Sequence, residues 1–155
     1  YQFNKADLGI NIARVLRDTR LDPKWLELEI TESGIMSNET ESIEKLRELK
    51  SLGVSISIDD FGTGYSSLSK LRDYPIETLK IDKSFIDNIP HDQKSAMIAR
   101  SIIDLAHNLG FKVVAEGVEN REQLSFLVQH RCDYYQGYYF FKPLHSKDFE
   151  EKIKM

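Results

Sequence analysis

The sequence predicts an α/β fold of about five strand–helix units, and three observations lead to this prediction. Short runs rich in β-branched residues alternate with amphipathic helical patterns along the whole chain. The connections between them are short, which is typical of parallel strands joined by right-handed crossovers. The length of 155 residues corresponds to one domain, because about 150 residues is the usual domain size.

Five runs have the length and the residue types of strands. They cover residues 26–30, 54–59, 78–81, 112–115 and 134–139. Residues 6–16 predict a helix before the first strand, and the apolar spacing at 43–49, 99–106 and 124–128 predicts helices between the later strands. Gly53 and Gly110 directly follow two of these helices, where glycine commonly ends a helix. Ser146 is expected to cap a short final helix.

Two architectures fit this order of elements: an open doubly wound sheet, and most of a (β/α)8 barrel. A barrel typically needs about 250 residues and at least about 200. Length alone therefore favours the open sheet.

The composition argues against several classes of function. The 21 Lys and Arg residues and the 25 Asp and Glu residues give a net charge of −4, whereas binding to a DNA or RNA polymer needs a basic stripe. The single cysteine, Cys132, rules out a disulfide framework and most cysteine-rich zinc sites. The sequence shows no signal peptide and no apolar run of about 18 residues, so we expect a soluble domain.

Acidic residues gather at the downstream ends of the predicted strands, which meet on one rim of a parallel sheet. Along the chain, the polar residues at these ends are Glu29, Glu32, Asp59, Asp60, Lys80, Asp82, Glu116, Glu119 and Gln136. Because neighbouring carboxylates repel one another, a cation is required among them. Lys80 is one candidate, and Mg²⁺ or Mn²⁺ is a better one, since both prefer oxygen ligands. Two such ions held by carboxylates activate water for attack on a phosphodiester.

Simpler interpretations compete with this one. A single acidic residue at a strand end is usually a helix cap or a surface ion pair. The adjacent pair Asp59 and Asp60 is the sharpest signal, because burying a carboxylate without a partner is costly. Gly62 and Gly64 lack the following Lys of a phosphate-binding loop. The aromatic residues within 134–141 could stack on bases, but aromatic residues of strands are more often core residues.

These residues resemble one known family, the EAL-type cyclic-di-GMP phosphodiesterases of bacteria, from Tyr1 to about Leu144. The matching segments are Glu29-Ile30-Thr31-Glu32-Ser33, Asp59-Asp60-Phe61-Gly62-Thr63-Gly64-Tyr65-Ser66-Ser67-Leu68, Leu79-Lys80-Ile81-Asp82, Ala115-Glu116-Gly117-Val118-Glu119 and Gln136-Gly137-Tyr138. Each segment alone is moderate evidence of kinship. Five segments in this order and at the family's spacing are specific.

The resemblance implies a (β/α)8 TIM-type barrel, of which about five units are present, and hydrolysis of cyclic-di-GMP to pGpG with Mg²⁺ or Mn²⁺. It implies that Glu29, Asp59, Asp60 and Glu116 bind two metal ions, and that Lys80 orients the attacking water and acts with Asp59, Asp60 and Glu116 in catalysis. Supporting or substrate-contacting roles fall to Glu32, Asp82, Glu119 and Gln136. The segment Phe61, Gly62, Thr63, Gly64, Tyr65, Ser66 and Ser67 is similar to the loop that couples dimerisation to the active site, and Glu32 would brace it.

The family's Glu-Ala-Leu motif and one family asparagine do not occur in the 155 residues, and Phe141 replaces a small residue. We therefore expect an EAL-like domain over 1–155 that is truncated at its N-terminus, with weak or no turnover of its own. Its sheet edges, at 26–30 and 134–139, would favour self-association.

The resemblance further implies a cytoplasmic homodimer and a parent protein with upstream sensory or cyclase domains, with or without a membrane tether. The alternative function is a non-catalytic cyclic-di-GMP receptor or a protein-interaction module.

Overall fold

Five parallel strands form a single sheet in the computed structural model, which describes residues 3, 7–36, 39–64 and 71–154. The strands are β1 (Glu27–Thr31), β2 (Ser55–Phe61), β3 (Thr78–Ile81), β4 (Lys112–Ala115) and β5 (Tyr134–Tyr135). Their spatial order is the order of the chain, from β1 to β5, and every neighbouring pair is parallel. The sequence prediction of β3 and β4 is confirmed to the residue.

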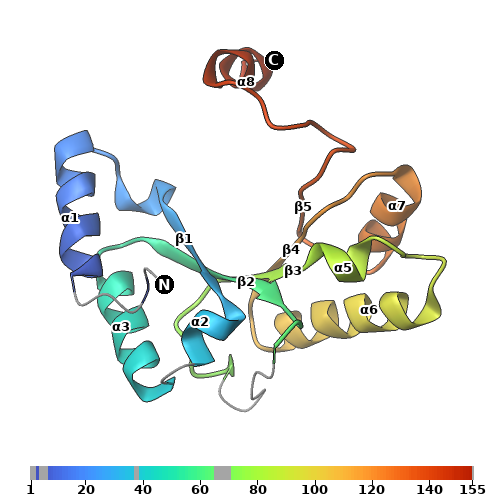
Figure 1. The fold of residues 1–155 in the computed structure, drawn as a ribbon, viewed down its shortest axis with the longest axis horizontal. Coiled ribbons are helices and arrows are strands. Elements are labelled where there is room, and N and C mark those ends of the chain that lie inside the picture. The colour runs from blue at the N-terminus through green and yellow to red at the C-terminus, as the bar shows by residue number, and fades with distance from the viewer. Residues whose placement is uncertain (1–2, 4–6, 37–38, 65–70, 155) are drawn as a thin grey trace.

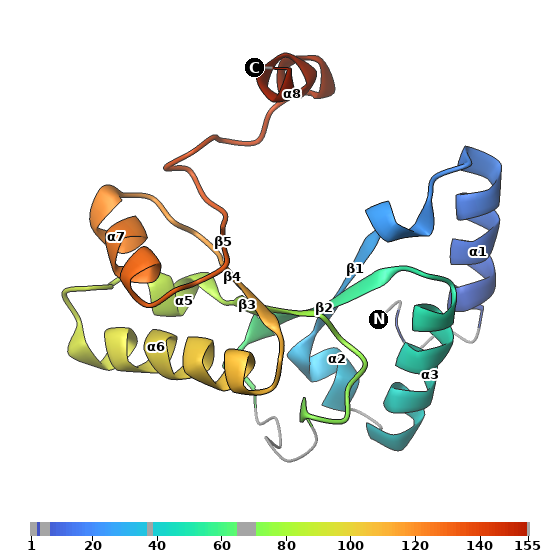
Figure 2. The ribbon, with the colours of Figure 1, turned by 180° about the vertical axis from the view of Figure 1, so that it is seen from behind.

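Most of the helices flank the convex side of this curved sheet (Figures 1 and 2). The helices are α1 (Leu8–Thr19), the short 3₁₀ helix η1 (Pro23–Trp25), α2 (Glu32–Met36), α3 (Glu39–Ser51), α5 (Lys83–Ile86), α6 (Gln93–Asn108), α7 (Arg121–Gln129) and α8 (Ser146–Ile153). Helix α8 lies at the end of an extended segment, away from the other helices (Figure 1). None of the helices in the described ranges is long and apolar enough to cross a bilayer.

The strand order corrects the preference for an open doubly wound sheet. In a doubly wound sheet the chain reverses direction across the sheet, so that strands distant in sequence become neighbours. Here each strand lies beside the next one in sequence, which is the arrangement of a barrel wall. The fold is an incomplete barrel, because β1 and β5 end the sheet instead of pairing with each other.

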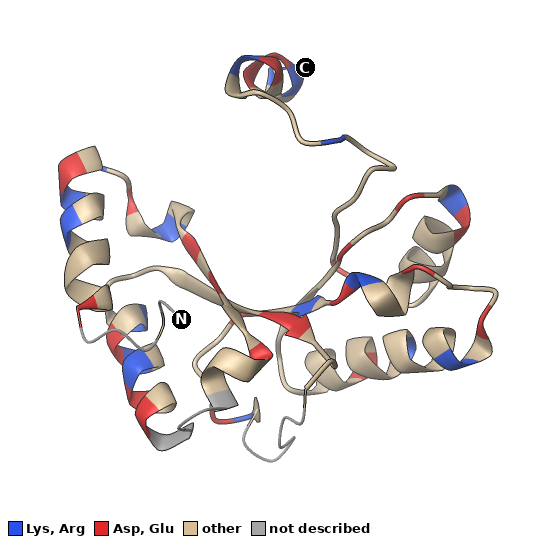
Figure 3. Cartoon of the chain, in the orientation of Figure 1, with Lys and Arg blue, Asp and Glu red and all other residues tan. Residues whose placement is uncertain are grey.

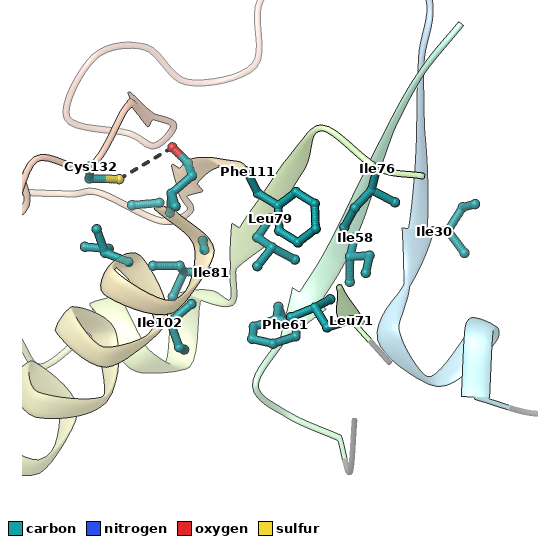
Figure 4. Packing of buried hydrophobic residues seen from close by; sticks show 14 of the residues in the cluster. Ile30, Ile58, Phe61, Leu71, Ile76, Leu79, Ile81, Ile102, Phe111 and Cys132 are labelled. Atoms are coloured by element: carbon teal, nitrogen blue, oxygen red, sulfur yellow. Dashed lines mark hydrogen bonds between the residues drawn. The ribbon is translucent and has the colours of Figure 1, made fainter. Parts of the chain in front are cut away.

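Alternation along the strands sorts apolar side chains from polar ones. Ile56 and Ile58 of β2 point toward the helices and are buried, and Leu79 of β3 joins them in the core. Figure 4 shows Ile58, Leu79 and Ile81 in one cluster with Ile102 of α6. The intervening positions, such as Ser57 and Lys80, therefore face the concave side of the sheet.

One irregularity interrupts this alternation at the end of β2. Ile58 pairs with Leu79, and Phe61 pairs with Ile81, so β2 contains one residue more than β3 over this interval. Asp60 lies in this β-bulge, and its backbone has a φ of 54°, a left-handed conformation that few non-glycine residues adopt. The bulge places two consecutive carboxylates, those of Asp59 and Asp60, at the same end of the sheet.

The C-terminal part of the chain differs from the prediction. Strand β5 ends at Tyr135 instead of residue 139, because the next residues leave the sheet and bind Val118: Val118 N donates to Gln136 O at 2.9 Å. The aromatic residues expected in the core are largely exposed, including Tyr138 and Phe141 at 58% and 57%. Ser146 is the first residue of α8 and not its cap. His145 precedes it without a capping side-chain hydrogen bond.

Candidate functional site

Lys80 is the buried centre of an ion cluster near the carboxyl ends of the strands. Its ammonium nitrogen lies 2.7 Å from Glu29 Oε1, 3.2 Å from Asp59 Oδ1 and 2.7 Å from Glu116 Oε1. The three carboxylates come from β1, from β2 and from the residue after β4, so four neighbouring strand ends contribute to the cluster. An ammonium group has three N–H donors, and each of the three has a carboxylate partner here.

The surroundings of Lys80 fix its charge. Burial by itself lowers the pKa of Lys80, since only 5% of its side chain is exposed, but hydrogen bonds to Glu116, Glu29 and Asp59 outweigh burial and raise the pKa well above its ordinary value. Lys80 therefore carries a positive charge at every physiological pH.

Beside Lys80, three carboxylates come close enough to share a cation. Asp59, Asp60 and Glu116 each offer one oxygen, and these oxygens lie within 4.8 Å of one another. The pKa of Asp60 is raised, first by burial and then by the negative charges of Asp59 and Asp82, and the opposing effect of Lys80 is smaller. One ammonium group thus leaves an excess of negative charge, and oxygen ligands of this kind suit Mg²⁺ or Mn²⁺.

Glu29 differs from the other predicted metal ligands. It contacts Lys80, but it does not belong to the group of three carboxylates, and 51% of its side chain is exposed. In Figure 3, acidic positions lie on the strands in the middle of the sheet as well as on the outer helices.

Glu32 ties the end of β1 to the segment that follows β2. It begins α2 and is buried, with 3% exposure. Its Oε2 accepts hydrogen bonds from Gly62 N at 2.9 Å and from Gly64 N at 3.2 Å. Of the predicted loop, Phe61 is buried and the Thr63 hydroxyl donates to Asp60 O at 2.8 Å.

The remaining residues of that loop, Tyr65, Ser66 and Ser67, lie outside the described residues.

The other predicted site residues lie around the start of α5 and the loop after β4. Asp82 caps α5 by accepting from Ser84 N at 3.0 Å. Glu119 pairs with Lys83 at 2.5 Å instead of contacting Lys80. A cavity of 240 Å³ adjoins this pair, and it is lined by Lys83, Glu116, Gly117, Glu119, Gln136, Gly137 and Tyr138. Glu116 thus belongs to both the ion cluster and this cavity.

Two residues of this region were not predicted from the sequence. Lys83 lies so close to the loop after β4 that a side chain at Gly117 would overlap it. Gln123 is buried in α7, with 2% exposure, and binds both that loop and α5. The pattern Asn120-x-x-Gln123 before an apolar run is a capping-box signature that could have drawn attention to Gln123.

The geometry agrees with comparisons to known proteins. The model of the EAL domain matches residues 2–143 of this chain. The chain belongs to the EAL domain family. Signaling protein YkoW of Bacillus subtilis is 48% identical to this EAL domain over 152 residues, which are 98% of this chain and 19% of YkoW. Cyclic di-GMP phosphodiesterase NbdA of Pseudomonas aeruginosa is 47% identical over 150 residues, which are 97% of this chain and 19% of NbdA.

Solved structures show the same fold. The cyclic-di-GMP complex of the MucR phosphodiesterase from Pseudomonas aeruginosa superposes with a TM-score of 0.93 at 41% identity, over 96% of this EAL domain and 60% of that chain. The complex of Klebsiella pneumoniae BlrP1 with manganese and cyclic-di-GMP superposes with a TM-score of 0.83 at 29% identity, over 92% and 36% of the two chains. The chain therefore spans about a fifth of the length of YkoW and NbdA and 60% of the MucR chain.

Proposed function

We propose that the protein containing this EAL domain hydrolyses cyclic-di-GMP to pGpG, and that the described rim supplies the larger part of its metal site. The observation that carries this proposal is the meeting of Glu29, Asp59 and Glu116 around Lys80, with Asp60 beside them. The buried ammonium group of Lys80 fixes the positions of three carboxylates. The negative charge that it does not neutralise favours the binding of a divalent ion. Relatives of the chain support the substrate, because NbdA is named a cyclic di-GMP phosphodiesterase.

The donor set fits the metal ions that the family resemblance implies. Asp59, Asp60 and Glu116 would hold Mg²⁺ or Mn²⁺, and Glu29 would complete the set from β1. Such ions, when bound, neutralise the phosphate and activate water for attack. The manganese complex of BlrP1 supports Mn²⁺ as one choice.

The chain's own residues orient the reactants. Lys80 keeps Glu29, Asp59 and Glu116 in one arrangement, so that the carboxylates are positioned before substrate binds. In the reaction, a water oxygen bonds to phosphorus and one ring P–O3′ bond breaks. The carboxylates accept the proton that the water loses, and the departing 3′ oxygen takes up a proton to become a hydroxyl group. The product is linear and keeps a 5′-phosphate.

Metal removal tests this function directly. The full protein stripped with a chelator should release no pGpG from cyclic-di-GMP, and Mn²⁺ or Mg²⁺ should restore its release, as measured by chromatography of the products. Turnover that survives complete metal removal would refute the proposal. Cyclic-di-GMP that binds but stays intact with either ion would favour the receptor alternative.

We also propose that the chain self-associates as a homodimer. Strands β1 and β5 each have one neighbour in the described sheet, and unpaired strand edges attract further strands. Exposed aromatic side chains add to this tendency, since Tyr134 of β5 and Phe149 of α8 are 56% and 54% exposed. Analytical ultracentrifugation of the 155-residue chain at micromolar concentration should show a dimer. A single monomeric species over the whole concentration range would contradict this proposal.

The expected cytoplasmic location, the upstream domains and the supporting roles of Glu32, Asp82, Glu119 and Gln136 remain predictions. The supporting roles are proposed because these four residues lie around Glu116 and the segment after β2.

A further inference from the structure

Gln123 uses every hydrogen-bonding position of its side-chain amide on backbone groups of two separate segments. Its Oε1 accepts from Glu119 N at 2.7 Å and from Asn120 N at 3.1 Å. Its Nε2 donates to Ile86 O at 3.1 Å and to Asp87 O at 3.2 Å. The side chain therefore links the loop after β4 to the end of α5, and its burial makes each lost bond costly.

Both linked segments continue directly from the ion cluster. The loop follows Glu116, and α5 follows the strand that carries Lys80, with Asp82 as its cap. The Lys83–Glu119 ion pair spans the same two segments. The two segments pack closely at Gly117, because a side chain at this position would overlap that of Lys83. A shift of α5 against the loop would therefore move Glu116 relative to Lys80.

We propose that Gln123 is a positioning residue for the metal site, which sets the distance between Glu116 and Lys80 by fastening the loop to α5. This inference rests on the proposed function. A residue that only caps α7 would need the Oε1 half alone, because that half completes the capping box with Asn120. The Nε2 half reaches α5 and has no part in the cap.

Substitutions can separate the role of the Gln123 Oε1 acceptor from that of its Nε2 donors. Gln123→Glu keeps the acceptor oxygen of the capping box and loses the N–H donors to Ile86 and Asp87. Asn120→Ala weakens the cap and leaves the link to α5 in place. Gln129→Met is the matched control, since Gln129 lies exposed on the same helix.

Mn²⁺ affinity and amide hydrogen exchange give the readouts, both on the folded 155-residue chain. The apparent Mn²⁺ dissociation constant is taken from paramagnetic broadening of amide NMR signals. Gln123→Glu should weaken Mn²⁺ binding roughly 10-fold or more, the size found when supporting groups of metal ligands are removed, and should speed exchange in residues 83–87. Asn120→Ala and Gln129→Met should change Mn²⁺ binding less than about 2-fold.

Equal losses of Mn²⁺ affinity in Gln123→Glu and Asn120→Ala would overturn the proposal, because capping alone would then explain both. Unchanged affinity in Gln123→Glu would overturn it as well. If Gln123→Glu does not fold, Gln123→Met removes the link to α5 and the capping oxygen together without adding a charge, and its loss of Mn²⁺ affinity should exceed that of Asn120→Ala, which weakens the cap alone. If the unmodified chain binds no Mn²⁺, exchange rates in residues 83–87 decide the role of Gln123, and unchanged exchange in Gln123→Glu then overturns the proposal. The proposed function is tested separately, by metal removal from the full protein.

Discussion

Asp59→Asn should abolish Mn²⁺ binding at the rim and lower cyclic-di-GMP hydrolysis by the full protein roughly 10³-fold. Asp59, like Glu116, contacts Lys80 and belongs to the group of three carboxylates, so the substitution weakens the ion cluster and the metal site together. The amide keeps an oxygen that accepts from Asp60 N, a bond of 3.1 Å, and the bulge is preserved. The measurements are paramagnetic broadening for the metal and product chromatography for the reaction.

Asp104→Asn provides the matched control for this change. Asp104 lies on the exposed side of α6 and pairs with Arg100. The control should leave metal binding and hydrolysis unchanged. Hydrolysis by Asp59→Asn within about 10-fold of the unmodified protein would remove the metal-based mechanism.

Lys80→Met should destabilise the metal-free chain by about 2 kcal/mol, because it leaves three carboxylates without their shared cation. The value is below that of a fully buried ion pair, since Glu29 and Asp59 keep 51% and 22% of their side chains exposed. Mn²⁺ should raise the melting temperature of the variant more than that of the unmodified chain, because the metal then supplies the missing charge. Hydrolysis by the full protein should fall as well, since the carboxylates lose their fixed arrangement.

The pH dependence of this difference follows from the raised pKa of Lys80. A group with a raised folded-state pKa contributes stability that is complete below its unfolded pKa and is lost as the pH rises through its folded pKa. The difference between Lys80→Met and the unmodified chain should therefore be constant from pH 6 to pH 9 and shrink only above the ordinary lysine pKa of 10.5.

Denaturant titrations across this range provide the test, and Lys24→Met, an exposed lysine 64% accessible, is the control. A difference that vanishes already at pH 7 would contradict the ion cluster.

Local sequence patterns predicted most of the secondary structure, because alternation and helical spacing depend on neighbouring residues. Strands β3 and β4 illustrate this. The predicted β5 was too long, since its continuation depends on a contact with Val118 that comes from a distant loop. The strand order, which separates a barrel from a doubly wound sheet, also depends on long-range packing and could not be deduced from length.

The candidate site was predictable only where it depends on the ends of the strands, and not where it depends on contacts between distant side chains. Parallel strands bring their carboxyl ends together, so the sequence placed Glu29, Asp59 and Glu116 on one rim, where the structure has them. The sequence did not show that Lys80 would contact all three. It also gave no sign that Glu119 would bind Lys83, because α5 was not among the predicted helices.

The extra residue in β2 has a consequence for how this rim tolerates change. In a regular strand, consecutive side chains project from opposite surfaces, so one of the two aspartates would point into the helix layer. Deleting a single residue between Ile58 and Phe61 would restore that regular geometry and would always remove one carboxylate, because Asp59 and Asp60 are the only residues of this interval. Insertions and deletions in this bulge should therefore impair metal binding more than most conservative replacements do, because the path of the main chain brings the two carboxylates together.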